Sequence, residues 1–175
     1  ANDLKRGVEV ALKILHQLDR DDAEALARFE REAQLAAKVD GRGGVARIHS
    51  MGWDRGLPYL AMELVNGEDL ARVFDSGLMD PRRLAEIVAS VARTLHACHL
   101  AGVVHRDLKP SNVIMPADGT RPKVVDFGLA RGAGAQRLTH TGATLGTPQF
   151  MAPEQAVDAS RATAPTVDVY QLGAI

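Results

Sequence analysis

The sequence has little cysteine, no excess of charge of either sign and no long apolar run. Its 175 residues include one cysteine, Cys98, which excludes an intrachain disulfide framework and fits a reducing cytosol. We expect Cys98 to be a small buried apolar residue. The formal net charge of -1 gives no basic surplus for binding nucleic acid or an anionic membrane. No apolar run approaches the roughly 18 residues of a membrane span, and no signal-like pattern opens the chain, so we expect a cytosolic segment.

The remaining composition is that of an ordinary globular chain. Hydrophobic residues make up 46% and charged residues 25% of the sequence, which excludes disorder by composition. A chain of this length can bury a substantial core. It contains no internal repeat and no low-complexity tract, so its function has to be sought in short motifs.

One short stretch carries most of the polar chemistry. Residues 105–112 read His-Arg-Asp-Leu-Lys-Pro-Ser-Asn, and residues 126–128 read Asp-Phe-Gly. Asp107 can accept the proton of an attacking hydroxyl, and Lys109 can reach a transferring phosphate. Asn112 and Asp126 can supply oxygen ligands to a hard divalent cation. Together these groups indicate phosphoryl transfer, although either motif alone would more simply be a solvated charge cluster or a turn after a strand.

The two motifs resemble the catalytic loop and the metal-binding loop of eukaryotic-type (Hanks-type) serine/threonine protein kinases. Ala-Pro-Glu-Gln at 152–155 and Asp-Val-Tyr at 168–170 are closest in style to bacterial members. The resemblance implies ATP and Mg²⁺, or Mn²⁺, as cofactors and serine or threonine of a protein as the acceptor. It also implies an α+β, bilobal fold with a small antiparallel N-lobe and a mainly helical C-lobe. Residues 1–65 would form a partial N-lobe with the hinge, and residues 66–175 a partial C-lobe.

The N-terminal third is expected to place a lysine and a glutamate near the phosphates. The short apolar run 8–15 predicts a strand with Lys13 near its end, and Lys13 resembles the kinase lysine that pairs with the α- and β-phosphates. The spacing of apolar residues predicts a helix over about 21–38. A helical wheel does not separate Glu30 from Glu32 as an ion-pair partner, but the resemblance selects Glu32. Without the resemblance, all three charged residues could simply face solvent.

The next segment is expected to hold the nucleotide base. Patterns at 45–50 and 57–65 predict two strands joined by a turn at 53–56, which complete an antiparallel sheet. Residues 62–65 (Met-Glu-Leu-Val) resemble the kinase hinge. The resemblance implies seven cofactor-binding positions, some of which could equally be plain core: Ala11, Lys13, Met62, Glu63, Val65, Asp69 at the ribose, and Ile114 below the base.

The C-terminal two thirds are expected to build the catalytic loop on a helical base. Asp80 followed by proline predicts the start of a helix that ends before Gly102. His96 and His99 lie on it as structural or surface residues rather than metal ligands. Runs at 113–115 and 123–125 predict a hairpin around 116–119, which brings Asn112 and Asp126 to neighbouring strand ends.

Residues 145–154 resemble the end of an activation segment, where a protein substrate docks. Thr147 is the expected docking residue, and with Lys109 it points to a serine/threonine rather than a tyrosine acceptor. Three loop threonines, Thr139, Thr141 and Thr144, are expected to be regulatory phosphorylation sites, with another copy of the same kind as the modifying partner and Arg106 as the partner of the phosphate. Threonines beside glycines can also be plain turn residues.

Four residues are expected to be structural by resemblance: Phe127, Gly128, Glu154 and Asp168, the last anchoring the catalytic loop from a helix. A glycine-rich phosphate loop before Lys13 and the later C-lobe helices are not in this sequence, nor is an arginine for Glu154. We therefore expect a central fragment of a catalytic domain, which could be inactive alone and whose full-length form could be membrane-anchored. The competing hypothesis is a pseudokinase or scaffold, against which Lys13 and the polar motifs count.

Overall fold

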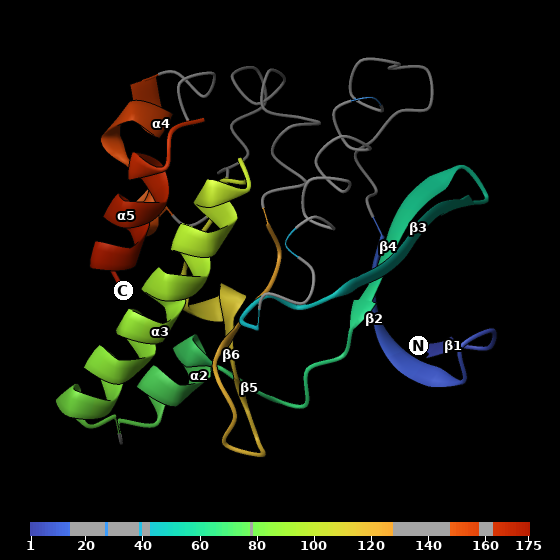
Figure 1. Ribbon diagram of the computed structural model, residues 1–175, viewed down its shortest axis with the longest axis horizontal. Helices are drawn as coiled ribbons and strands as arrows, with labels where there is room; N and C mark the ends of the chain where they lie inside the picture. The colour runs from blue at the N-terminus through green and yellow to red at the C-terminus, as the bar shows by residue number, and fades with distance from the viewer. Residues whose placement is uncertain (15–26, 28–38, 40–42, 78, 128–147, 158–162) are drawn as a thin grey trace.

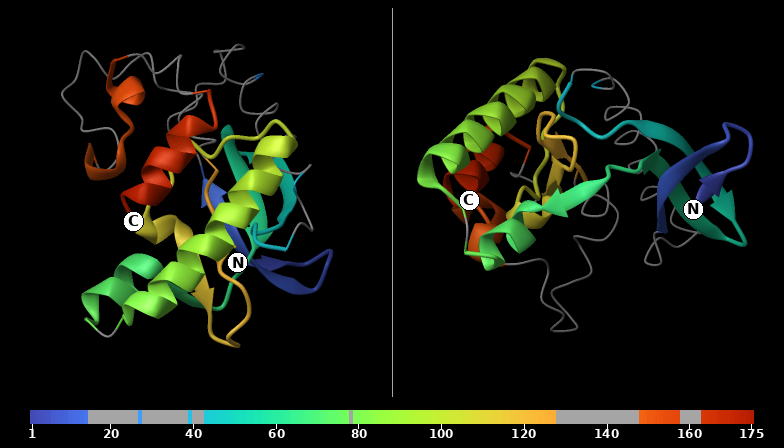
Figure 2. Two further views of the ribbon diagram at one scale, coloured as in Figure 1. Left: turned by 60° about the vertical axis from the view of Figure 1, so that its left-hand side comes forward. Right: turned by 90° about the horizontal axis from the view of Figure 1, so that it is seen from below.

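The strands of the computed structural model form two antiparallel sheets within the residues that it describes, which are 1–14, 27, 39, 43–77, 79–127, 148–157 and 163–175. The larger sheet has the order β1 (Asn2–Asp3), β2 (Val8–Ile14), β4 (Leu57–Glu63), β3 (Ile48–Asp54). The smaller has the order β5 (Gly67–Asp69), β6 (Val113–Pro116), β7 (Lys123–Val124). Figures 1 and 2 show the larger sheet at one end, the long helices at the other, and the smaller sheet between them.

The helices are α2 (Leu70–Asp75), α3 (Pro81–Leu100), α4 (Pro153–Val157) and α5 (Thr166–Gly173), with short 3₁₀ turns η1 (Pro110–Asn112) and η2 (Pro148–Phe150). The predicted start of α3 is confirmed: the Asp80 carboxylate accepts a hydrogen bond from the Arg82 N–H, and proline follows the cap. In the described part of the chain, no helix is both long and apolar enough to cross a membrane.

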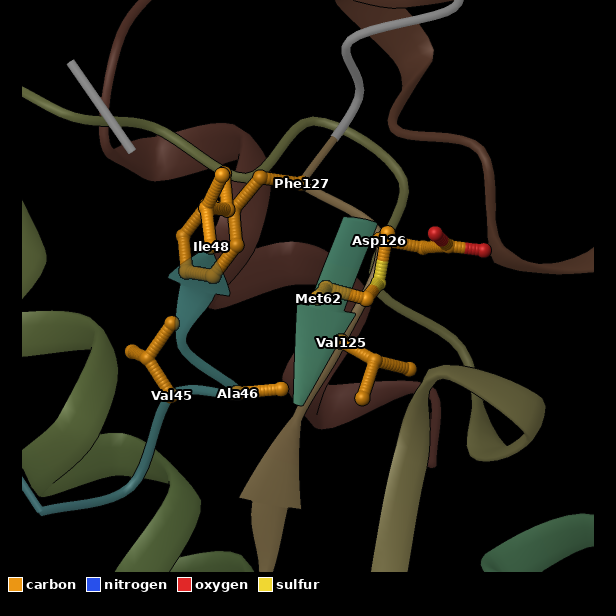
Figure 3. A pocket seen from close by; sticks show the side chains of 7 residues that line it. All are labelled: Val45, Ala46, Ile48, Met62, Val125, Asp126 and Phe127. Carbon is orange, nitrogen blue, oxygen red and sulfur yellow. The ribbon is translucent and has the colours of Figure 1, made fainter. Parts of the chain in front are cut away.

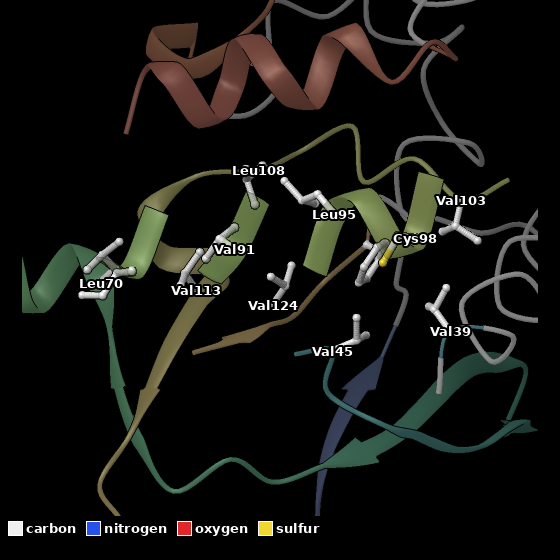
Figure 4. Packing of buried hydrophobic residues seen from close by; sticks show 12 residues of the cluster. Val39, Val45, Leu70, Val91, Leu95, Cys98, Val103, Leu108, Val113 and Val124 are labelled. Carbon is white, nitrogen blue, oxygen red and sulfur yellow. The ribbon is translucent and has the colours of Figure 1, made fainter. Parts of the chain in front are cut away.

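Buried residues of α3 form the main core with the smaller sheet. Ile87, Val91, Leu95 and Cys98 are each 3% exposed or less and belong to one buried cluster with Val113 and Val124, and Figure 4 shows Val91, Leu95 and Cys98 in this cluster. Full burial of such an aliphatic side chain stabilises the fold by about 1.5–3 kcal/mol, so this face holds the helix against β6 and β7. The expectation that Cys98 is a buried apolar residue is confirmed.

The strand prediction for 45–50 was partly wrong. Strand β3 begins only at Ile48 and runs to Asp54, whereas Val45 makes a parallel bridge to Val124 of the smaller sheet. The Ala46 N–H donates to the Val124 carbonyl oxygen at 3.0 Å. The apolar segment before Ile48 therefore connects the two sheets, a long-range pairing that a local pattern does not reveal.

The predicted turn at 53–56 is shorter in the structure. Arg55 and Gly56 have φ values of 47° and 85°, as in a two-residue hairpin turn, and residues 53 and 54 belong to β3. Strand β4 ends at Glu63, two residues before the predicted end, and β2 reaches Ile14. Among the described elements, β1, β5, α2 and α4 were not predicted, and neither were the 3₁₀ turns η1 and η2.

The predicted hairpin before the Asp-Phe-Gly motif is confirmed as β6 and β7, with Val113 paired to Val124. Its first strand extends to Pro116, and Val125 lies just beyond the second. The Val125 N–H donates to the Asn112 carbonyl oxygen at 3.0 Å. The two ends of the hairpin that carry Asn112 and Asp126 are thereby tied together.

Candidate active site

Asp107, Lys109 and Asn112 lie together on the loop before β6. Lys109 Nζ is 3.3 Å from Asp107 Oδ2, with both side chains about one quarter exposed. The Asn112 amide nitrogen donates to the Asp107 carbonyl oxygen at 2.7 Å and reaches Asp107 Oδ2 at 3.5 Å. The Asn112 amide fixes the Asp107 backbone, so the Asp107 carboxylate is held beside the Lys109 ammonium.

Lys13 reaches this region from the larger sheet. Its Nζ donates to Asp126 Oδ1 at 2.8 Å, and the two residues are separated by 113 positions in the chain. Lys13 projects from β2, opposite Leu60 of β4, while Asp126 follows β7 in a left-handed backbone conformation with φ of 59°. A non-glycine residue rarely adopts this conformation, and such outliers cluster at functional sites. The fold therefore joins the two sheets through this ion pair.

His105 is the buried centre of the catalytic loop. Burial lowers its pKa from the ordinary value of 6.5, against the opposing effects of Asp168, the Val125 carbonyl, Asp107 and Asp126. The Asp107 N–H donates to Nδ1 at 3.2 Å, so the proton of the neutral ring lies on Nε2 and is donated to the Val125 carbonyl oxygen at 2.9 Å. His105 thus links the Asp107 backbone to the segment that carries Asp126.

Phe127 packs against this imidazole, with ring centroids 4.7 Å apart and the planes tilted by 46°. Figure 3 shows the Phe127 ring on one side of the backbone and the Asp126 carboxylate pointing to the other. The hollow drawn there encloses about 20 Å³ and is lined by Val45, Ala46, Ile48, Met62, Val125, Asp126 and Phe127. It has room for about one water molecule.

The expected hinge residues lie at the end of β4. Ala11 and Met62 are paired in neighbouring strands, whereas Ile114 lies on the smaller sheet opposite Asp69. Val65 is half-buried beyond the strand. The sequence-based pocket is thus divided between two sheets, with Ala11 and Met62 directly adjacent.

Glu63 fastens the hinge to β7. Its carboxylate lies 3.1 Å from Lys123 Nζ and accepts the Arg47 N–H at 3.0 Å. Burial alone would raise the pKa of Glu63, but the Arg47 hydrogen bond and the Lys123 ammonium outweigh it and lower the pKa below 4.5. The side chain of Glu63 therefore fixes the end of β4 against Lys123 and the Arg47 backbone, a role that its position in the sequence did not reveal.

The Asp69 carboxylate caps α2, because it accepts the Arg72 N–H at 3.0 Å. The expected ribose contact of Asp69 stays a prediction.

Glu154 is half-buried in the first turn of α4. Six other predicted residues lie outside the described residues: Glu32, Gly128, Thr139, Thr141, Thr144 and Thr147.

Asp168 is fully buried on α5 beneath the catalytic loop. Its Oδ1 accepts the Arg106 N–H at 2.8 Å, and its Oδ2 accepts the His105 N–H at 2.8 Å and lies 2.7 Å from His99 Nε2. Arg106 has a left-handed φ of 67°, so these bonds offset the strain of an unusual backbone. The sequence reasoning placed Asp168 here but gave His99 no partner.

Two glutamines beside Asp168 were missed. Gln171 is 1% exposed on α5, and both it and Gln155 of α4 donate to the Arg106 carbonyl oxygen, at 3.2 and 2.8 Å. A buried amide must find partners, and Gln171 stands three residues after Asp168 on the same helical face. That spacing was the signal that could have indicated its contact with the loop.

The comparisons with known proteins agree with this geometry. A family model described as "Protein kinase domain" matches residues 1–175. Serine/threonine-protein kinase PknA of Mycobacterium tuberculosis is 38% identical over 100% of this chain, and PknL of the same organism is 37% identical over 99%. The chain spans 41% and 43% of the lengths of these two relatives.

Among solved structures, the crystal structure of the Mycobacterium tuberculosis PknI kinase domain matches with a TM-score of 0.69 and 27% identity. The match covers 93% of this chain and 60% of that chain. The expected α+β fold, with an antiparallel sheet at one end and helices at the other, is confirmed.

Proposed function

The chain belongs to the protein kinase domain family, and we propose that the intact protein transfers the γ-phosphoryl group of ATP to serine or threonine hydroxyls of protein substrates. The single observation that carries this proposal is the convergence of Lys13 with Asp126 beside the Asp107 loop. The names of the relatives PknA and PknL support the class of acceptor.

Asp107 is the proposed proton acceptor for the attacking hydroxyl, and Lys109 the cation beside the transferring phosphate. Lys109 Nζ lies 3.3 Å from Asp107 Oδ2, so the two groups could act on the attacking hydroxyl and the phosphate at the same place. The backbone of Asp107 is held through its own N–H by His105 and through its own carbonyl by Asn112. These bonds limit the freedom of the carboxylate, which is how positioned groups accelerate a reaction.

The residues fit a divalent cation. The amide nitrogen of Asn112 is engaged by the Asp107 carbonyl, so Oδ1 is the atom left to act as a ligand together with the Asp126 carboxylate. Hard oxygen donors of this kind suit Mg²⁺ or Mn²⁺. When bound, the cation neutralises charge on the phosphate oxygens. Lys13 would also neutralise negative charge on the phosphate oxygens, from the N-lobe side, and Glu32 is its proposed second partner.

The adenine site is proposed at the end of β4, where the backbone groups of Glu63 and Val65 would pair with the base beside Ala11 and Met62. Ile114 would cover the other face of the base from the smaller sheet, and Asp69 would meet the ribose. The ion pair of Glu63 with Lys123 supports this assignment, because it fixes the hinge segment against β7.

Regulation, domain division and location follow the same proposal. Residues 1–65 would serve as the nucleotide-holding lobe and residues 66–175 as the catalytic and substrate lobe, with Thr147 in the docking segment. Phosphates on Thr139, Thr141 or Thr144, added by another copy, would pair with Arg106. Because the reaction draws on ATP, we expect the segment to work in the cytoplasm, with or without a membrane anchor elsewhere.

The test is transfer of labelled γ-phosphate from ATP to a generic protein substrate by the full-length protein with Mg²⁺. Asp107→Asn should lower kcat by about 10²- to 10⁴-fold, the usual loss for a general base. Asp118→Asn is the matched control, because Asp118 is exposed in the loop between β6 and β7 and bonds only locally to Thr120. A wild-type protein that transfers no phosphate, or an Asp107→Asn variant as active as the control, would refute the proposal.

A further inference from the structure

Gln171 holds the backbone on both sides of Asp107. Its Oε1 accepts the Leu108 N–H at 2.8 Å, and its Nε2 donates to the Arg106 carbonyl oxygen at 3.2 Å. The Arg106 carbonyl belongs to the peptide group before Asp107, and the Leu108 N–H to the peptide group after it. A single side-chain amide therefore brackets the residue that presents the proposed base.

Gln155 reinforces this bracket from α4. Its Nε2 donates to the same Arg106 carbonyl oxygen at 2.8 Å, and its Oε1 accepts both the Gln171 Nε2 at 3.0 Å and the Ala152 N–H at 3.0 Å. The two glutamines thus form one network in which each amide has partners for its nitrogen and its oxygen. A hydrogen-bonded network of this kind rigidifies the groups that it joins.

The glutamine network holds backbone groups that Asp168 does not hold. The Asp168 carboxylate holds the N–H groups of His105 and Arg106, which precede Asp107 in the chain. The glutamines hold the Arg106 carbonyl and the Leu108 N–H, so they, unlike Asp168, reach the peptide group after Asp107, whose carbonyl oxygen is also held by Asn112. The left-handed φ of Arg106 makes the orientation of these peptide groups sensitive to what holds them.

We propose that Gln171 and Gln155 are positioning residues that set the orientation of the Asp107 carboxylate, an inference that rests on the proposed function of Asp107. Gln155 directly follows the docking segment 145–154, so the network also ties that segment to the base. An aliphatic side chain could fill the same buried space at Gln171 without the cost of burying an amide, which indicates that the hydrogen bonds are the reason for glutamine.

The experiment compares Gln171→Met and Gln155→Met with wild type in the full-length protein. Methionine keeps length and volume but removes the hydrogen bonds. In Gln171→Met, kcat should fall about 10- to 100-fold with an unchanged KM for ATP, because misplacement of the base affects chemistry rather than nucleotide binding. In Gln155→Met the fall should be about fivefold, because only one of the three hydrogen bonds that the Gln155 side chain makes reaches the Arg106 carbonyl, and Gln171 still donates to that oxygen.

Amide hydrogen exchange separates positioning from general loosening. In Gln171→Met, the Leu108 amide should exchange faster, whereas the His105 and Arg106 amides, which Asp168 holds, should keep their protection. In Gln155→Met, all three amides should stay protected, because the bond from Leu108 to Gln171 remains. This second variant, at a half-buried position, also tests the proposal through kcat if Gln171→Met does not fold.

Unchanged kcat in both folded variants would overturn the proposal, as would equal loss of protection at all three amides. Selective exposure of Leu108 with reduced kcat and constant KM would support it. If wild type transfers no phosphate, the proposed function fails separately, and the exchange pattern still decides whether the glutamines hold this backbone.

Discussion

Replacing Asp168 by asparagine tests the buried support of the catalytic loop. The carboxylate is 0% exposed, and its two oxygens accept the His105 and Arg106 N–H groups at 2.8 Å and contact His99 Nε2 at 2.7 Å. Asparagine has one carbonyl oxygen, which can keep the position shared by His105 and His99. Its NH₂ group would then face the Arg106 N–H, so two donors would meet where one bond existed.

The loss of one hydrogen bond to a charged acceptor costs about 1.5–3 kcal/mol, and the bond to His99 also loses its charge assistance. We therefore expect Asp168→Asn to lower the free energy of unfolding by about 3 kcal/mol, the upper end of the range for one such hydrogen bond. This loss of stability is large because the Arg106 N–H would be left without an acceptor.

Urea unfolding of the full-length protein, followed by tryptophan fluorescence, measures this loss, with Asp118→Asn as the exposed control. With a typical slope of about 2–3 kcal/mol per molar urea, the midpoint should fall by roughly 1 M or more. A midpoint within about 0.2 M of the control, at an unchanged slope, would show that the loop does not depend on these hydrogen bonds.

Three further predictions concern pH, the hinge and regulation. Because burial lowers the pKa of His105, the unfolded chain binds a proton that the folded chain does not. The free energy of unfolding should therefore fall as pH drops below about 6.5, and it should fall more steeply than in His105→Asn. Equal slopes of unfolding free energy against pH in the two proteins between about pH 6.5 and 5 would contradict a lowered pKa of His105. Lys123→Met should raise the pKa of Glu63 towards 4.5 in a carboxyl NMR titration and lower the free energy of unfolding by about 1 kcal/mol. An unchanged pKa of Glu63 would show that Lys123 does not affect its ionisation. Alanine at both Thr139 and Thr141 should lower kcat in the full-length protein, and unchanged turnover would count against their regulatory role.

Much of the fold could be predicted because it is encoded locally. The cap and proline at the start of α3, the alternating strands of the larger sheet and the hairpin before Asp126 follow from backbone preferences and periodicity. The pattern failed at 45–47, where Val45 pairs with Val124 of the other sheet. A strand signal shows that a segment is extended and apolar, but it does not name the neighbour that the segment will pair with.

The sequence by itself determined the chemical groups of the site, because the loop 105–112 places a carboxylate, a cation and an amide within a few residues. Tertiary structure decided their partners: the contact of Lys13 with Asp126 spans 113 positions and exists only because two sheets meet. The same holds for Gln155 and Gln171, whose hydrogen bonds to the loop and to each other arise only because the fold buries Gln171 and half-buries Gln155 beside it. Short motifs encode chemistry locally, whereas burial and pairing depend on the whole chain.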